Sequence, residues 1–277
     1  LDGGIPLTGN ATLKEIRDGL LDFRQSGKFV YHYSEILTQK GYYLASAADS
    51  VLLNPEGFFE WKGLSASITY LKEAMDKLGL KPEVLRATGN KFKSAVEPYI
   101  RQDMGEENRM QLSALLNSVW SDYTSDISAS RNLSTEKLDQ MANEHAIIDP
   151  KPAAENGLIH ATVYEDEIMR VLMDKSGTDK VEDIPFIGIH AYAQSANLSN
   201  DAGYNADRIA VVIAQGDIVS GMGNEYSIGS ERIAEALRKV RTNDKVKAVV
   251  LRVNSPGGSA LASEVIWREV DLLRKVK

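Results

Sequence analysis

The sequence predicts an α/β fold, in which short apolar strands and helices alternate along the chain and pack in layers. Residues 208–215 and 246–253 are near-continuous apolar runs, as expected of strands in a buried sheet. Helices are expected between and after these strands, over 230–241 and 260–277. This strand–helix order is the pattern on which the prediction rests.

The first part of the chain alternates in the same way. A helix over 13–23 is predicted from apolar residues at helical spacing, with Asn10 or Thr12 as its cap. Runs rich in β-formers predict three strands, over 29–33, 50–53 and 83–87. Further helices are expected over 35–47, 70–78, 105–130, 135–144 and 164–174.

Two of these elements carry specific expectations. Asn54-Pro55 and Gly57 follow the strand over 50–53 and predict a turn that closes it. The helix over 105–130 is amphipathic, and its apolar face is expected to contain Leu112, Leu115, Leu116 and Val119.

Residues 191–206 are polar, contain Asn, Ser and Gly, and are weakly periodic, which predicts a linker or long loop. They divide the chain into a first unit, 1–190, and a second, 207–277. Gly3-Gly4 before the first helix resembles Gly257-Gly258 before the last helix, a weak internal repeat. The repeat implies an excised part of a longer protein, with N-terminal strands missing from the first unit and the second unit truncated.

Composition limits the classes of function. The formal charge is −7 at pH 7, and no Lys/Arg block with interleaved aromatics is present, so no nucleic acid partner is expected. The absence of cysteine excludes disulfides, thiolate metal sites and Cys nucleophiles within these residues. No metal and no cofactor are expected, because no metal-ligand spacing is found among the four histidines, His32, His145, His160 and His190.

The turn Asn254-Ser-Pro-Gly-Gly258 between a strand and a helix is the first candidate site. Adjacent glycines allow backbone N–H groups to approach a ligand, and the helix N-terminus adds positive dipole. Such a turn can stabilise an oxyanion or bind a phosphate, or it can be a tight connection without a ligand. It matches neither a P-loop nor a dinucleotide fingerprint.

The second candidate is the segment that contains Lys91 and Lys93. These residues can be an ordinary solvated pair, or one of them can act as a general base. A free lysine has a pKa of about 10.4, so a base that works near neutral pH needs burial or neighbouring charge to lower its pKa. An enclosed cleft is therefore the expected setting of a catalytic lysine.

Three motifs resemble the signal peptide peptidase A (protease IV) family, in its long, two-repeat bacterial type. They are Asn254-Ser-Pro-Gly-Gly-Ser259 with Ala262-Ser-Glu-Val265, Lys93-Ser-Ala-Val-Glu-Pro-Tyr-Ile-Arg101 with Asp103-Met104, and Gly41-Tyr-Tyr-Leu-Ala-Ser-Ala-Ala-Asp49. The resemblance extends over essentially the whole chain. It implies tandem crotonase-like (Clp protease-like) repeats built from ββα units.

The resemblance also implies a serine endopeptidase with a Ser-Lys dyad. Lys93 matches the general base, and Gly257 and Gly258 match the oxyanion hole. The nucleophilic serine is expected beyond residue 277, and Gln39 stands at its counterpart in the first repeat, so this chain alone is expected to be inactive. The implied partners are cleaved signal peptides and further copies of the chain in a homotetramer. The implied place is the bacterial inner membrane, facing the periplasm, with an anchor outside this chain.

Two other functions stay open from the residues. The Gly-rich turn could hold a thioester carbonyl in an acyl-CoA-processing crotonase relative. The chain could also be an assembly domain whose catalytic apparatus has decayed, which Gln39 favours locally.

Overall fold

The computed structural model of the chain describes residues 5–85, 89–145, 147–195 and 207–277. The chain divides into unit 1, Leu1–Phe186, and unit 2, Ile187–Lys277. Parallel strands and helices alternate in both units, so the predicted α/β class is confirmed. The turn at residues 1–4, on which the internal repeat rests, lies outside the described residues.

Unit 1 contains a three-stranded parallel sheet in the order β1 (Tyr31–Leu37), β2 (Ser50–Phe59), β3 (Ala161–Thr162). The turn expected at Asn54-Pro55 is wrong, because β2 continues to Phe59. The pairing passes from Ser34↔Leu53 to Ile36↔Phe58, so these turn-forming residues make an irregularity inside one strand. Gly57 permits it, since a Cβ there would lie 2.3 Å from the carbonyl oxygen of Glu35.

The predicted helices of unit 1 occur in order with shifted ends. They are α1 (Asn10–Gln25), α2 (Gln39–Ala45), α3 (Lys72–Lys77), α5 (Glu106–Arg131), α6 (Thr135–Gln140) with a π-helical turn (Met141–His145), and α8 (Glu165–Ser176). The helices α4 (Glu97–Ile100) and α7 (Pro150–Glu155) and a 3₁₀ turn (Val181–Asp183) occur in addition, without having been predicted.

Three sequence predictions for unit 1 need correction. The helix expected from residue 35 begins only at Gln39, because 35–37 belong to β1 and the Thr38 hydroxyl caps α2 by accepting from the Gly41 N–H at 3.2 Å. Neither expected side-chain cap is used by α1, whose N-cap is Gly9. Residues 81–85 have no regular structure where a strand was expected over 83–87, and 86–87 lie outside the described residues.

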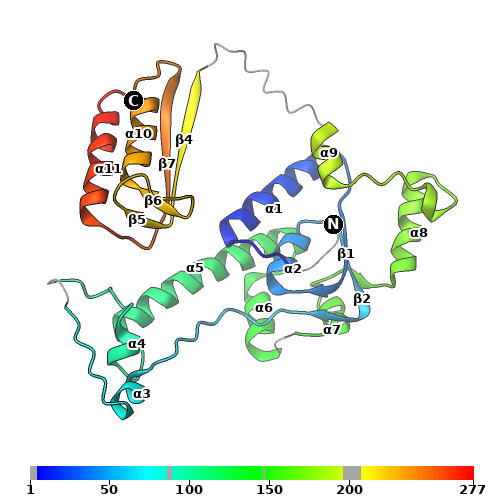
Figure 1. The fold of residues 1–277 in the computed structure, drawn as a ribbon. Coiled ribbons are helices and arrows are strands. Elements are labelled where there is room, and N and C mark those ends of the chain that lie inside the picture. Colours follow the sequence, from blue (N-terminus) through cyan, green and yellow to red (C-terminus); the bar gives the residue numbers. More distant parts are fainter. Residues whose placement is uncertain (1–4, 86–88, 146, 196–206) are drawn as a thin grey trace. The chain divides into compact units, whose positions relative to one another are not determined.

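The core of unit 1 gathers around Tyr42 of α2, Phe59 of β2 and Trp61, whose rings meet edge to face. Only the C-terminal half of α5 joins this core, through Tyr123 and Ile127. The apolar face predicted earlier in the helix is not fully buried: Leu115 is 60% exposed. In Figure 1 the first turns of α5 run away from the sheet toward α3 and α4, which explains this exposure.

Unit 2 contains the parallel pair β4 (Arg208–Gln215) and β7 (Val246–Asn254) and the short parallel pair β5 (Asp217–Val219) and β6 (Ser227–Gly229). Helices α10 (Ser230–Arg241) and α11 (Ala260–Leu273) pack on one face of β4 and β7 (Figure 1). Their contact buries Val212, Ala214, Ile233, Leu237 and Leu273.

Two predictions for unit 2 are also corrected. The opposite face of β4 is exposed in the described chain, at Ile209, Val211 and Ile213, although a continuous apolar run predicted burial on both faces. A helix, α9 (Ile189–Ser195), occupies the start of the segment expected to be a loop, and 196–206 lie outside the described residues. In the described part of the chain, no helix combines the length and apolar character needed to cross a membrane.

Candidate functional site

The Gly-rich turn that follows β7 depends on glycine for its backbone conformation. Gly257 has φ +117° and Gly258 has φ +152°, which residues with a Cβ rarely adopt. The hydroxyl of Ser255 accepts a hydrogen bond from the Gly257 N–H at 3.1 Å and so closes the turn locally. The sequence therefore encodes an unusual conformation here, and not only a short connection.

Gly258 lies directly against β5. The Ile218 N–H donates to the Gly257 carbonyl and the Ser259 N–H donates to the Ile218 carbonyl, both at 2.9 Å. In a parallel bridge of this kind the neighbours of Gly258 make the bonds, so the N–H of Gly258 itself points away from β5. A Cβ on Gly258 would lie 2.2 Å from the Ile218 carbonyl oxygen, so no larger residue fits.

The N-terminus of α11 lies immediately after this turn. Ser259 caps the helix, and its hydroxyl accepts from the Ala262 N–H at 3.3 Å. Among the described residues, no acceptor is found for the Gly258 N–H. The turn thus presents a free backbone donor beside a helix N-terminus, an arrangement that can stabilise a developing negative charge.

Lys93 lies in unit 1, in an irregular segment between α3 and α4. Its backbone N–H donates to the Asn90 carbonyl at 3.4 Å, while its side chain is exposed. No described residue accepts a hydrogen bond or ion pair from its ammonium group. The described residues of unit 1 therefore form no enclosed cleft around Lys93 of the kind expected for a catalytic lysine.

The two predicted halves of the site lie in different units of the chain. Lys93 belongs to unit 1, and Gly257 and Gly258 belong to unit 2. Their roles as base and oxyanion hole stay predictions.

Gln39, at the position expected to correspond to the nucleophile, is the first residue of α2 and is only 6% exposed. Its side-chain oxygen accepts from the N–H groups of Lys62 and Gly63, each at 3.0 Å. Its amide nitrogen donates to the Gly63 carbonyl at 3.0 Å. The side chain therefore clamps the segment that follows β2, and an amide has no nucleophilic oxygen to offer.

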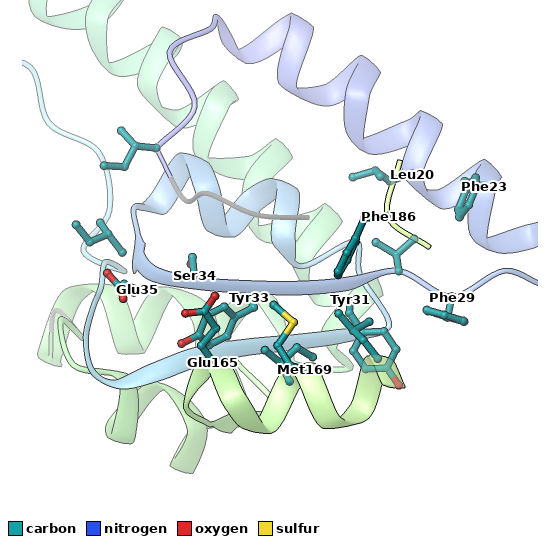
Figure 2. A pocket seen from close by; sticks show the side chains of 15 residues that line it. Leu20, Phe23, Phe29, Tyr31, Tyr33, Ser34, Glu35, Glu165, Met169 and Phe186 are labelled. Carbon is teal, nitrogen blue, oxygen red and sulfur yellow. The ribbon is translucent and has the colours of Figure 1, made fainter. Parts of the chain in front are cut away.

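A groove that sequence reasoning missed runs along β1, an edge strand of the sheet in unit 1. It has a volume of about 1100 Å³ and is lined mainly by aromatic and aliphatic side chains from β1, α1 and α8. Figure 2 shows Tyr31, Tyr33 and Met169 along its length and the carboxylates of Glu35 and Glu165 near one end. Neither Lys93 nor Gln39 lines it, so it is separate from the candidate catalytic residues of unit 1.

Two of the four histidines, His32 and His160, have structural contacts. His32 is buried, its Nε2 lies 3.1 Å from the Ser34 hydroxyl, and burial lowers its pKa from 6.5 to about 4. The Nδ1 of His160 accepts from the Val51 N–H at 2.8 Å, and its pKa is also lowered by burial and by Arg131. His190 is exposed on α9, and the side chain of His145 lies outside what is described. No group of three metal-ligating side chains occurs within the described ranges.

Comparison with known proteins shows a match of residues 22–179 to Peptidase family S49. The chain is 32% identical over 273 residues to "Serine protease SPPA, chloroplastic" of Arabidopsis thaliana, covering 97% of this chain and 40% of that protein. It is 34% identical to "Protease 4" of Haemophilus influenzae and 35% identical to "Protease 4" of Salmonella typhi, covering 92% and 95% of this chain.

The chain spans about two fifths of the length of these relatives, 40%, 42% and 43% in turn. Among solved structures, an enoyl-CoA hydratase/isomerase from Marinobacter aquaeolei covers 66% of this chain and 48% of its own, with 12% identity and a TM-score of 0.26. We draw no argument from a likeness this low.

Proposed function

The chain belongs to peptidase family S49, and on that premise we propose that it is part of a serine endopeptidase that uses a Ser-Lys dyad. In this proposal Lys93 is the general base, and the turn of Gly257 and Gly258 holds the oxyanion. The nucleophilic serine is contributed by polypeptide that follows residue 277. The observation that carries the proposal is the Gly258 N–H, which has no acceptor among the described residues and lies beside the N-terminus of α11.

The chemistry requires each part. The lysine must be neutral to take the proton from the serine hydroxyl, which then attacks the peptide carbonyl. The carbonyl oxygen becomes negative as the bond forms, and a backbone N–H aimed at it stabilises that charge. Removal of one such donor from an oxyanion hole costs on the order of 100-fold in kcat.

The exposure of Lys93 supports assembly as a condition of activity. A lysine in water keeps its proton at neutral pH, so a working base must be covered by other protein surface. We propose that further copies of the protein supply this cover in a homotetramer. The proposed substrates are apolar, membrane-derived peptides such as cleaved signal peptides. The proposed location is the bacterial inner membrane, with the catalytic part facing the periplasm.

The structural role of Gln39 favours one alternative. Gln39 stands at the expected nucleophile position of the first repeat, and its buried side chain instead holds the segment that follows β2. A decayed assembly domain would contain a replacement of this kind. In that alternative, polypeptide that includes the region after residue 277 would assemble but would not hydrolyse peptides.

The test is hydrolysis of a fluorogenic apolar peptide by the polypeptide that carries this chain and its continuation. We expect Lys93→Ala to abolish hydrolysis, while assembly, followed by size-exclusion chromatography, is unchanged. The matched control is Lys91→Ala, which removes an equally exposed lysine two residues earlier and is expected to keep its activity. Full activity in Lys93→Ala would refute the assignment, and an inactive parent that assembles would favour the decayed domain.

A further inference from the structure

Glu97 is a buried carboxylate four residues after Lys93, and its role is not explained by the dyad. It is the first residue of α4 and is only 7% exposed. Carboxylates are rarely buried unless their oxygens are paired or hydrogen-bonded. Its contacts therefore show what the surrounding fold requires of it.

The carboxylate of Glu97 binds the N-terminus of α5. Its Oε2 accepts from the Gly105 N–H at 3.1 Å and from the side-chain amide of Asn108 at 3.0 Å. Gly105 is the N-cap of the 26-residue helix α5, and Asn108 is itself only 5% exposed. The positive end of the helix dipole adds to these two bonds, so the negative charge of Glu97 is matched to this place.

The Glu97 carboxylate lies directly against Gly105. A Cβ on Gly105 would lie 2.5 Å from Oε1 of Glu97 and 3.2 Å from its carboxyl carbon, so a larger residue would force the carboxylate to shift. The φ of Gly105 is −62°, which any residue adopts, so a substitution here would act through Glu97 and not through backbone strain.

A second contact holds the other end of the lysine segment to the same helix. The side-chain amide of Gln111 donates to the Phe92 carbonyl at 2.8 Å. Gln111 and Asn108 are three residues apart and so lie on one face of α5. Lys93 is therefore held between two anchors on α5, one at Phe92 and one at Glu97.

We infer that Glu97 is a positioning residue, which holds the Lys93 segment on α5 at the place where the base must meet its serine. The inference rests on the proposed function, because it needs Lys93 to be the base. The hydrogen-bond partners of the Glu97 carboxylate are Gly105 and Asn108, so Glu97 acts on Lys93 through the backbone of the segment. A base displaced by about 1 Å can lose on the order of 100-fold in rate.

Two variants disrupt the contact between Glu97 and Gly105, one by changing Glu97 and the other by changing Gly105. Glu97→Gln keeps the size of the side chain and removes its charge, and Gly105→Ala pushes the carboxylate away without changing its charge. In the polypeptide that carries the nucleophile, we expect each to lower kcat by about 10- to 100-fold, with KM within about twofold of the parent. If Glu97→Gln does not fold, Gly105→Ala decides.

The matched control is Asp49→Asn. The carboxylate of Asp49 also accepts from one backbone N–H, that of Val30 at 2.8 Å, and one side chain, that of Arg24 at 2.7 Å. Asp49 has no proposed part in the site, so the kcat of Asp49→Asn is expected to stay within about twofold of the parent. Lys93→Ala is measured in the same assay.

The outcomes separate this inference from the proposed function. If Lys93→Ala is inactive and both Glu97→Gln and Gly105→Ala keep the parent kcat, the positioning role is overturned and the proposed function stands. The positioning role is also overturned if the kcat values of Glu97→Gln and Gly105→Ala, corrected for the fraction of folded protein, fall no further than the kcat of Asp49→Asn. If Lys93→Ala stays active, the proposed function itself fails.

Discussion

Protonation of His32 is expected to destabilise unit 1 in mild acid. His32 is 2% exposed, and burial lowers its pKa from 6.5 to about 4, so the folded chain holds this imidazole neutral. The unfolded chain takes up the proton at its ordinary pKa. Between these two pH values the unfolded state binds more protons, so stability is complete above pH 6.5 and is lost as pH falls toward 4.

The magnitude follows from the same two pKa values. Each pKa unit corresponds to about 1.4 kcal/mol, so the whole loss is about 3 kcal/mol, and about 2 kcal/mol of it is present at pH 5. Such a loss is a large part of the stability of an ordinary domain, which is about 5–15 kcal/mol.

The assay is urea unfolding at pH 7 and pH 5, followed by tryptophan fluorescence. Trp61 and Trp120 report on unit 1, since their rings stack in its core with centroids 4.7 Å apart. His32→Gln is expected to be less stable at pH 7 and to lose the part of the pH dependence that comes from His32, while the part from His160, whose pKa is also lowered, remains. His190→Gln, at an exposed position, should keep the whole pH dependence. Equal pH dependence in the parent and His32→Gln would refute the reasoning.

Two further predictions concern Gln39 and Gly258. Gln39→Ala removes three hydrogen bonds of a buried side chain and is expected to lower the free energy of unfolding, measured in urea, by about 3 kcal/mol. The control Gln25→Ala, at an exposed position, should change this free energy by less than about 0.5 kcal/mol. Gly258→Ala introduces a Cβ 2.2 Å from the Ile218 carbonyl oxygen at φ +152°. Gly258→Ala is expected to lower the melting temperature of unit 2 and to abolish peptide hydrolysis by the polypeptide that carries this chain and its continuation. Gly188→Ala, whose new Cβ meets no atom within 4 Å, should do neither. An unchanged melting temperature in Gly258→Ala would contradict the geometry.

Most helices and strands could be predicted because their signals are local. Apolar spacing over 3.6 residues predicts α1, α8 and α10, and apolar runs predict β4 and β7. The errors occur where a long-range pairing overrides a local preference. Asn54-Pro55 and Gly57 form a turn in most contexts, yet pairing with β1 keeps them inside β2.

The candidate site divides in the same way. Lys93, Gly257 and Gly258 were predicted from motifs, because glycine at a strand–helix turn and a lysine in a specific segment are visible in the residues themselves. Glu97 lay inside the same motif, but its function was not visible. Its partners Gly105 and Asn108 are recognised only when the chain folds back on α5.

The sequence by itself therefore determined the α/β class, the order of most elements, the family and the candidate base and oxyanion turn. Only the tertiary structure decided that Gln39 is a clamp, that the Gly258 N–H points away from β5, and that Glu97 anchors the lysine segment. The physical reason is that periodicity and backbone preference act between near neighbours. Burial and hydrogen bonding instead depend on residues far apart in the chain, which meet only after folding.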